Sequence, residues 1–310
     1  MRVHFGNDVF FVTNRCEEER FFMLPRAKVN HLIGTWLAKA LEKYGDGIEI
    51  FAFIFLSNHF HILLRDNKGQ LAKFMWYLQL NLGKAINKLN NERIGHFFCK
   101  KYDAAFVATD EDFIDRYAYV VTNAVKAGLV SKASAAPFFS SLPSALSEKP
   151  MRFKWIDWTA FHNRTRRNQK VDIKEFERVS EIRLAAPPMW ASYSKAKRGK
   201  VIAQLVKQYE RRYAKERRAV GTSVLGAQKI KGQKWWMRPK NPARRPRVKV
   251  FCRIKELKEE ILDAIHAMTS AYRDVYQRFY KWALSGRLKP LPWPKGAYPP
   301  SFMAPVAMAD

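Results

Sequence analysis

The chain has 310 residues, 47% of them hydrophobic, and a formal net charge of +28 at pH 7. This length and apolar content allow one large domain or two, each with a substantial core. The three cysteines are far apart, which excludes a disulfide framework and a cysteine-rich zinc site. No apolar run approaches membrane-spanning length and no signal-peptide pattern opens the sequence, so we expect a cytoplasmic protein that does not bind a membrane.

The positive charge is concentrated in the second part of the chain. Residues 1–130 contain 17 Lys/Arg and 14 Asp/Glu, whereas residues 131–310 contain 39 Lys/Arg and 14 Asp/Glu. The first part therefore has the charge balance of an ordinary folded domain. The second part is suited to a polyanionic partner, and nucleic acid fits it better than a membrane surface.

The first predicted elements are a strand over residues 9–14 and an amphipathic helix over residues 29–44, which two following glycines end. Residues 51–65 (FAFIFLSNHFHILLR) then predict a β-hairpin. An apolar run rich in Phe and Ile is typical of a buried strand, and Ser57-Asn58 is typical of a tight turn.

Three further elements complete the first domain, which we predict to span residues 1–132. Residues 70–89 have the apolar spacing of a second helix, and residues 96–108 predict a strand pair or one bent strand. Residues 110–130 predict a third helix, because acids at its start suit the helix dipole and Gly128 lies near its end. This order predicts an α+β fold in which helices pack on an antiparallel sheet.

The second strand of the hairpin contains a pair of histidines, His59 and His61. Side chains alternate along a strand, so these two point to one face while Phe60 points to the other, into the core. Neutral imidazoles on a buried strand need polar partners, and a divalent metal ion is one such partner. Two ordinary histidines, satisfied by hydrogen bonds, are the alternative interpretation.

The third predicted helix contains two polar residues at helical spacing, Tyr119 and Asn123. Residues four apart share a helix face, so both side chains can reach one site. Tyr117 should point roughly the opposite way, which suits packing.

The joint pattern resembles the single-tyrosine HUH transposases, the superfamily of insertion-sequence and REP-associated tyrosine transposases. It consists of Asn-His-Phe-His on a hairpin and, downstream, Tyr-x-x-x-Asn followed by Ala-Val-Lys-Ala-Gly. The resemblance covers roughly residues 5–132, and Ala124 stands where the family commonly has proline. It implies the HUH-endonuclease fold, a ferredoxin/RRM-like core.

The resemblance also implies a function and assigns residues to it. The substrate would be single-stranded DNA, often beside a hairpin, and Tyr119 would be the nucleophile that forms a covalent 5′-phosphotyrosine. His59, His61 and Asn123 would hold Mg²⁺ or Mn²⁺, and imidazole ligands favour Mn²⁺. The family includes monomers and dimers, so a homodimer is possible.

The remaining chain predicts a linker over residues 133–150 and a basic, mainly α-helical extension over residues 151–310. Residues 174–184 predict a short helix, residues 195–219 a long helix with ten Lys/Arg, and residues 250–285 another long helix. The prolines of residues 291–300 predict an extended arm.

Two parts of this extension are candidates for DNA contact. The basic helix can contact phosphates, or it can be a solvated helix that packs by its apolar stripe. In residues 229–247 cations alternate with tryptophans, which suits bases that stack while cations follow the backbone. The predicted DNA-binding residues are Lys200, Lys207, Arg211, Arg212, Lys215, Lys234, Trp235, Trp236, Arg238, Arg244 and Arg245.

These observations favour a metal-dependent single-stranded DNA endonuclease and strand transferase, a transposase with a DNA-binding extension. The alternative is a non-catalytic, domesticated nucleic-acid-binding protein that keeps the fold. A small-molecule metalloenzyme leaves the basic extension unexplained.

Overall fold

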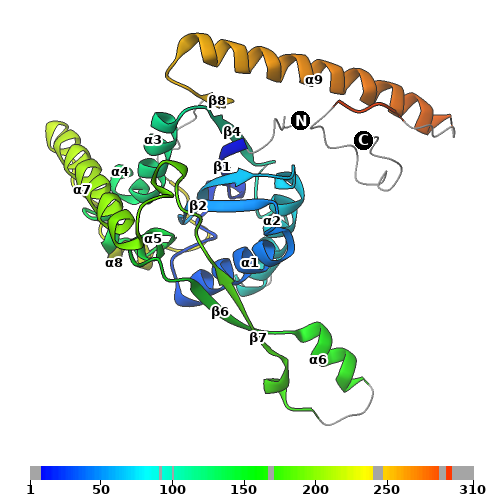
Figure 1. Ribbon diagram of the computed structural model, residues 1–310. Helices are drawn as coiled ribbons and strands as arrows, with labels where there is room; N and C mark the ends of the chain where they lie inside the picture. The colour runs from blue at the N-terminus through cyan, green and yellow to red at the C-terminus, as the bar shows by residue number, and fades with distance from the viewer. Residues whose placement is uncertain are drawn as a thin grey trace.

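The protein has the α+β fold that the sequence predicts, and its main sheet has six strands (Figure 1). The computed structural model describes residues 8–90, 93–99, 101–166, 171–239, 247–285 and 291–294. The strand order is β5-β2-β3-β1-β4-β8. These strands are β1 (Asp8–Arg15), β2 (Ile48–Phe55), β3 (His59–Asp66), β4 (Asp103–Val107), β5 (Phe139–Ser140) and β8 (Val250–Phe251).

Helices cover both faces of this sheet (Figure 1). One face packs on α1 (Ala27–Tyr44) and α2 (Leu71–Leu89). The other face packs on α3 (Asp110–Val121), α4 (Asn123–Lys126), α5 (Leu142–Ser147), α7 (Lys195–Ala219) and α8 (Ala227–Gly232). Short 3₁₀ turns lie at Glu17–Glu19, Ala133–Ala135, Ile173–Phe176 and Pro188–Trp190.

The β2–β3 hairpin forms where the sequence predicts it, in the middle of the sheet. Alternation along β3 divides its side chains between two cores: Phe60, Ile62 and Leu64 pack towards α1 and α2, whereas Leu63 packs towards α3. His59 and His61 have the same parity as Leu63, so both lie on the α3 face.

Local hydrogen bonds fix the helices beside the sheet. Thr109 caps α3, because its hydroxyl accepts from the backbone N–H of Asp112. Asp66, at the end of β3, is fully buried and accepts from the backbone N–H groups of Gln70 and Leu71 at 2.8 and 2.9 Å. Its carboxylate therefore stabilises the start of α2.

Two parts of the extension project from this body (Figure 1). The β6–β7 arm consists of an antiparallel ribbon, β6 (Met151–Ile156) and β7 (Glu177–Ile182), with α6 (Trp158–Thr165) between its strands. The arm packs on α1 at Gly34, where an added Cβ would lie 2.1 Å from the Phe153 ring. The other part is α9 (Lys255–Leu284), a 30-residue helix that buries only Val275 and Phe279.

The structure corrects several predicted elements. The sheet is mixed, because β8 pairs in parallel with β4, whereas an antiparallel sheet was predicted. Residues 133–150 are not a free linker: β5 pairs with β2 at Ile54 and Phe55, and Leu142 is buried. Residues 174–184 form a 3₁₀ turn and β7 in place of a helix. The domain division at residue 132 stays a prediction.

Other predictions agree with the structure or lie outside it. Residues 96–108 contribute a single strand, β4, while α7 spans the predicted residues. No helix in the described ranges combines the length and apolar character that crossing a membrane requires. Most of the predicted proline-rich arm lies outside the described residues, which include only 291–294 of it.

Candidate active site

His59 lies at the start of β3, beside the hairpin turn, with one ring nitrogen engaged. Its Nδ1 is 2.7 Å from Oδ1 of Asn58, and Nδ2 of Asn58 donates to the Glu19 carbonyl at 3.1 Å. The second bond orients the Asn58 amide, so Oδ1 is the acceptor and His59 Nδ1 carries the proton. The lone pair of His59 is therefore on Nε2.

His61 is buried between two aromatic rings. It stacks on Phe11 at 5.1 Å between ring centroids and meets the Tyr119 ring edge-to-face at 5.3 Å. Neither ring nitrogen of His61 has a hydrogen-bond partner among the described residues. Buried polar groups without partners are rare in folded proteins, and each needs a physical explanation. The two histidine rings lie 5.0 Å apart.

Both histidines are held neutral by their surroundings. Burial, and to a smaller extent the charge of Arg15, lower the pKa of His59 to about 4. Burial also lowers the pKa of His61, with His59 and Arg15 as smaller causes. Neutral imidazole is the form that donates a lone pair to a metal ion.

Tyr119 lies on α3, half-buried above this face of the sheet. Two cations flank its ring: the Lys126 Nζ lies 4.5 Å and the Arg116 guanidinium carbon 5.2 Å from the ring centroid. Phe11 contacts the same ring edge-to-face at 5.7 Å. The structure therefore brings His59, His61 and Tyr119 together within one chain, with positive charge beside the phenol.

The helix predicted over residues 110–130 is interrupted at Thr122, where α3 ends and α4 begins. Tyr119 is on α3 and Asn123 on α4, so the two do not share one continuous helix as predicted. The Asn123 side chain is buried, at 4% exposure. Tyr117 is also buried and contacts Phe113 and Trp190, in agreement with its predicted packing role.

Sequence reasoning missed the aromatic and cationic surroundings of Tyr119. Phe11 comes from β1, and Phe251, which contacts both Phe11 and Arg116, comes from β8 in the extension. The sequence could have indicated Arg116, because it lies three residues before Tyr119 on α3. No sequence pattern indicates that Phe251 is near, because it is far from Tyr119 along the chain.

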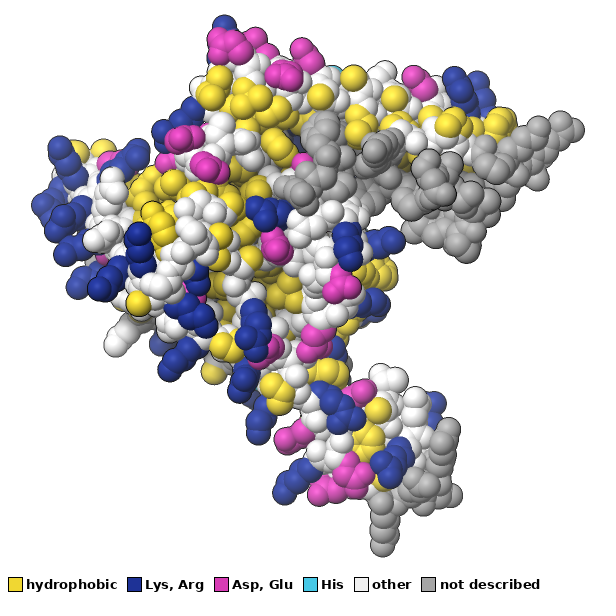
Figure 2. All heavy atoms as spheres, in the orientation of Figure 1, with side chains coloured by type: hydrophobic (Ala, Val, Ile, Leu, Met, Phe, Trp, Pro, Cys, Tyr) yellow, Lys and Arg dark blue, Asp and Glu magenta, His cyan; other side chains and the backbone are white. Residues whose placement is uncertain are grey.

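Dark blue Lys and Arg side chains gather along α7 at the left edge of Figure 2. All five predicted contacts on this helix are exposed, and Arg212 forms an ion pair with Glu216. Lys207, Arg211 and Lys215 are spaced by four residues and form one stripe, away from the buried side chains of α7.

The predicted contacts after α7 divide into three groups. Trp235 is half-buried and packs on Phe22, whereas Trp236 is 52% exposed. Lys234 and Arg238 are exposed, and Arg238 lies 4.0 Å from Glu18. Arg244 and Arg245 lie outside the described residues.

The described part of the chain contains no cluster of three His, Cys, Asp or Glu side chains that could hold a metal ion. A metal site here would therefore use His59, His61 and ligands of other types.

Comparisons with known proteins give remote structural likenesses. No protein-family model and no curated protein matches the sequence. Among solved structures, a REP-associated tyrosine transposase bound to a REP hairpin is similar, with a TM-score of 0.39 and 16% identity. The match covers 47% of this chain and 82% of that chain. A likeness this remote does not assign a function.

Proposed function

We propose that the protein nicks and joins single-stranded DNA through Tyr119, with a divalent metal ion at His59 and His61, as a transposase of the HUH kind. One observation supports this most: the buried His61 ring has no partner for either nitrogen and lies against the ring of a tyrosine. A metal ion bound by His61 would explain why a ring with two unpaired nitrogens is buried there.

The histidine pair fits a metal ion. His59 has its Nδ1 proton bound by Asn58, which is the usual arrangement for a metal-binding histidine, because it fixes the ring and directs Nε2 outward. Mg²⁺ or Mn²⁺ bound there would neutralise phosphate charge and stabilise the leaving oxygen. Asn123 is the proposed third ligand, through its amide oxygen.

Tyr119 is the proposed nucleophile. Its phenolic oxygen attacks the phosphorus, the bond from phosphorus to the 3′ oxygen breaks, and a 5′-phosphotyrosine forms. The phenol loses one proton and the released 3′ oxygen gains one, so the exchange of esters balances. Because the ester bond is kept, another 3′-hydroxyl can reverse the attack, which permits strand transfer.

Arg116 and Lys126 support this role for Tyr119. Both place a positive charge within about 5 Å of the centre of its ring, so a phosphodiester that approaches the phenolic oxygen comes near both cations. Side-chain cations at that position hold the phosphate and favour the developing negative charge. Beyond the site, the exposed stripe of α7 is proposed to contact the DNA backbone and Trp236 to stack on a base.

Covalent trapping tests the proposal. The full chain is incubated with end-labelled single-stranded oligonucleotides that carry hairpins, with Mn²⁺ or with EDTA, and run on denaturing gels. We expect a metal-dependent protein–DNA adduct that Tyr119→Phe abolishes, while Tyr117→Phe retains it. DNA binding that neither EDTA nor Tyr119→Phe alters, without an adduct, would contradict the proposal and favour the non-catalytic alternative.

A further inference from the structure

A cavity of about 260 Å³ lies on the far side of α3 from Tyr119. Its walls come from β2, α3, α5, the segment after β7, and the first turns of α7. That segment lies beside β2, because the Ala185 N–H donates to the Ile50 carbonyl at 2.8 Å. The cavity therefore lies where the extension packs on the sheet domain, and it is separate from the histidine pair.

The most deeply buried residues that line the cavity are apolar or aromatic. Phe51, Tyr117 and Ile202 line it and are each no more than 2% exposed, and Leu184 and Pro187 continue the apolar wall. The Tyr117 hydroxyl has no hydrogen-bond partner among the described residues, and burial raises its pKa. A buried phenol that lines a cavity without a partner can donate to a ligand in it.

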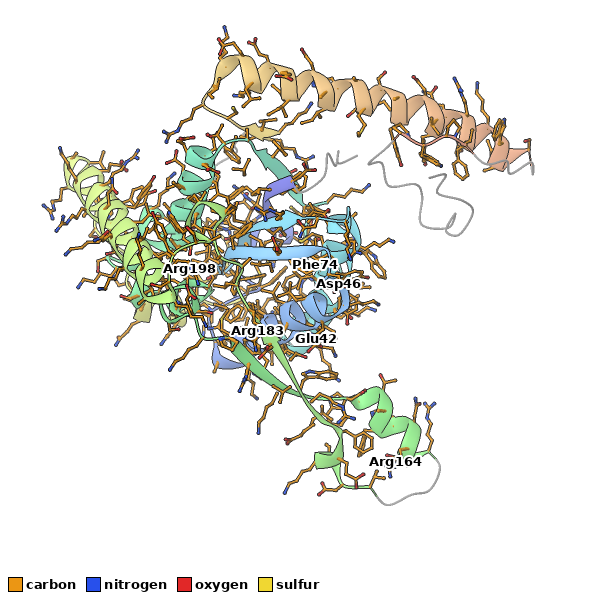
Figure 3. The ribbon with its side chains drawn as sticks, in the orientation of Figure 1. Glu42, Asp46, Phe74, Arg164, Arg183 and Arg198 are labelled. Carbon is orange, nitrogen blue, oxygen red and sulfur yellow. The ribbon has the colours of Figure 1, made fainter. Side chains whose placement is uncertain are left out.

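Cations gather at the rim of the same cavity. Lys149, Arg183, Lys195 and Arg198 line it together with one carboxylate, Glu148. Arg183 and Arg198 are labelled in Figure 3, where they come from the end of β7 and from α7. Lys149 and Lys195 form no ion pair with the described residues, whereas Arg183 pairs with Glu181.

The carboxylate of Glu148 is paired with Arg198. Both Glu148 oxygens accept from Arg198, which also donates to the carbonyls of Ala191 and Tyr193. Glu148 has a φ of 52°, a left-handed conformation that is unfavourable for a residue with a Cβ. Arg198 is the main partner of Glu148, and Lys195 acts on this carboxylate more weakly, so both lysines can still contact an anionic ligand.

We infer that this cavity binds one nucleotide, with the base against the Phe51 and Tyr117 side and the phosphate at Lys149 and Lys195. A flat apolar base suits the aromatic interior, a base edge can accept from the Tyr117 hydroxyl, and a phosphate suits unpaired lysines. The volume is slightly below the roughly 300–1,000 Å³ of sites for drug-sized ligands, so the cavity would hold the base while the phosphate stays at the open rim.

This site is independent of the chemistry proposed for Tyr119, although the two share α3. The nucleotide can be free in solution or part of a bound strand, because both present the same base and phosphate. A nucleotide bound in the cavity would restrict the motion of Tyr117 and of α3, the helix that contains Tyr119.

Calorimetric titration of the full chain tests the site. The probes are the four deoxynucleoside 5′-monophosphates, the matching nucleosides and inorganic phosphate. We expect at least one monophosphate to bind more tightly than its nucleoside and than phosphate alone. The double variant Lys149→Gln/Lys195→Gln should weaken this binding at least tenfold, and Tyr117→Phe about fivefold to tenfold. The double variant Lys154→Gln/Lys174→Gln, an equal charge change on the β6–β7 arm, should leave binding unchanged.

A second experiment tests whether the bound nucleotide belongs to a DNA strand. If no free monophosphate binds, oligonucleotides that contain a photoreactive thymine analogue should cross-link to the peptides around Tyr117 and residues 183–187. Either positive result supports the site, also in a Tyr119→Phe background. Phosphate that binds as tightly as the nucleotides, binding that the variants do not alter, or neither binding nor cross-link would overturn the inference. Melting curves of each variant check that it is folded.

Discussion

The Tyr209 hydroxyl on α7 donates a hydrogen bond of 2.8 Å to Asp115 on α3, the helix that contains Tyr119. Asp115 also accepts from Arg253, which precedes α9. Arg217 on α7 also donates a hydrogen bond of 2.7 Å to the carbonyl of Val125 on α4. The basic helix is therefore tied directly to the helix of the candidate nucleophile, and Asp115 lies one turn before Tyr119.

This bond predicts a pH dependence. Burial and the bond to Asp115 raise the pKa of Tyr209 from 10.0 to about 12. The folded state therefore holds this proton more tightly, so the contribution to stability is complete below pH 10 and is lost as pH rises towards 12. Tyr209→Phe should lower the free energy of unfolding by about 1 kcal/mol at neutral pH. Urea denaturation of both proteins should find that the difference shrinks above pH 10.

Tyr276→Phe on α9 is the matched control, because Tyr276 is 42% exposed. A Tyr209→Phe difference that stayed constant or grew between pH 10 and 12 would contradict the role given to the bond.

His61→Phe should separate stability from metal binding. Phenylalanine keeps an aromatic ring against Phe11 and Tyr119 but removes two buried nitrogens that lack partners. Without metal, we expect the variant to gain about 1–2 kcal/mol in unfolding free energy. It should also lose Mn²⁺ binding, measured by electron paramagnetic resonance, and DNA cleavage.

His59→Phe is the comparison for this variant. His59 Nδ1 already has Asn58 as its partner, so its replacement should bring no gain in stability while it also removes metal binding. Destabilisation by His61→Phe, with Mn²⁺ binding intact, would rule out the role proposed for His61.

Gly34→Ala should loosen the β6–β7 arm. Helix propensity alone favours alanine by about 1 kcal/mol. The added Cβ would lie within 2.1 to 2.7 Å of three Phe153 ring atoms, and such overpacking costs about 1–3 kcal/mol. We expect a net loss in thermal stability and faster proteolysis of the arm.

A Phe153→Ala background provides the internal control. With the ring removed, Gly34→Ala should become neutral or stabilising, so the two changes are coupled. Equal effects of Gly34→Ala in both backgrounds would show that the arm does not pack there.

The α7 stripe predicts a change in the salt dependence of DNA binding. Replacing Lys207, Arg211 and Lys215 by glutamine should weaken binding to single strands. Because each phosphate contact contributes about 0.7 to the slope of log affinity against log salt, the slope should fall by about 2. Fluorescence anisotropy across a salt series measures it.

Glutamine at Lys255, Lys258 and Lys281 removes the same charge from exposed positions on α9. If this control triple changed the slope as much as the α7 triple does, DNA would not be bound preferentially along α7.

The sequence predicts the parts of the fold that depend on local patterns. The β2–β3 hairpin, α1, α2 and α7 are each specified by the period of their own apolar residues. His59 and His61 share a face for the same reason, since alternation along β3 needs no tertiary information. The placement of Tyr119 over His61 depends on how α3 packs on the sheet, which no local pattern specifies.

Other features depend on contacts between distant residues and could not be predicted from local patterns. α3 ends at Thr122 although the apolar spacing continues past it, and Tyr213 of α7 packs with the residues on either side of this break. Trp235 and Trp236 are adjacent and chemically identical, and only the position of Phe22 makes one a packing residue. The parallel pairing of β8 with β4 joins segments that are far apart in the sequence.

Each outer strand of the main sheet, β5 and β8, is only two residues long. Long, flat outer strands expose rows of unpaired backbone N–H and C=O groups and invite pairing with another chain. Here each outermost strand offers only two residues to such a partner, and β2 beside β5 also bonds through its Ile50 and Phe53 carbonyls to Ala185 and Ser141. If two copies of this chain associate, we expect contacts between side chains to hold them together. Such an association should depend on surface charge and therefore on ionic strength.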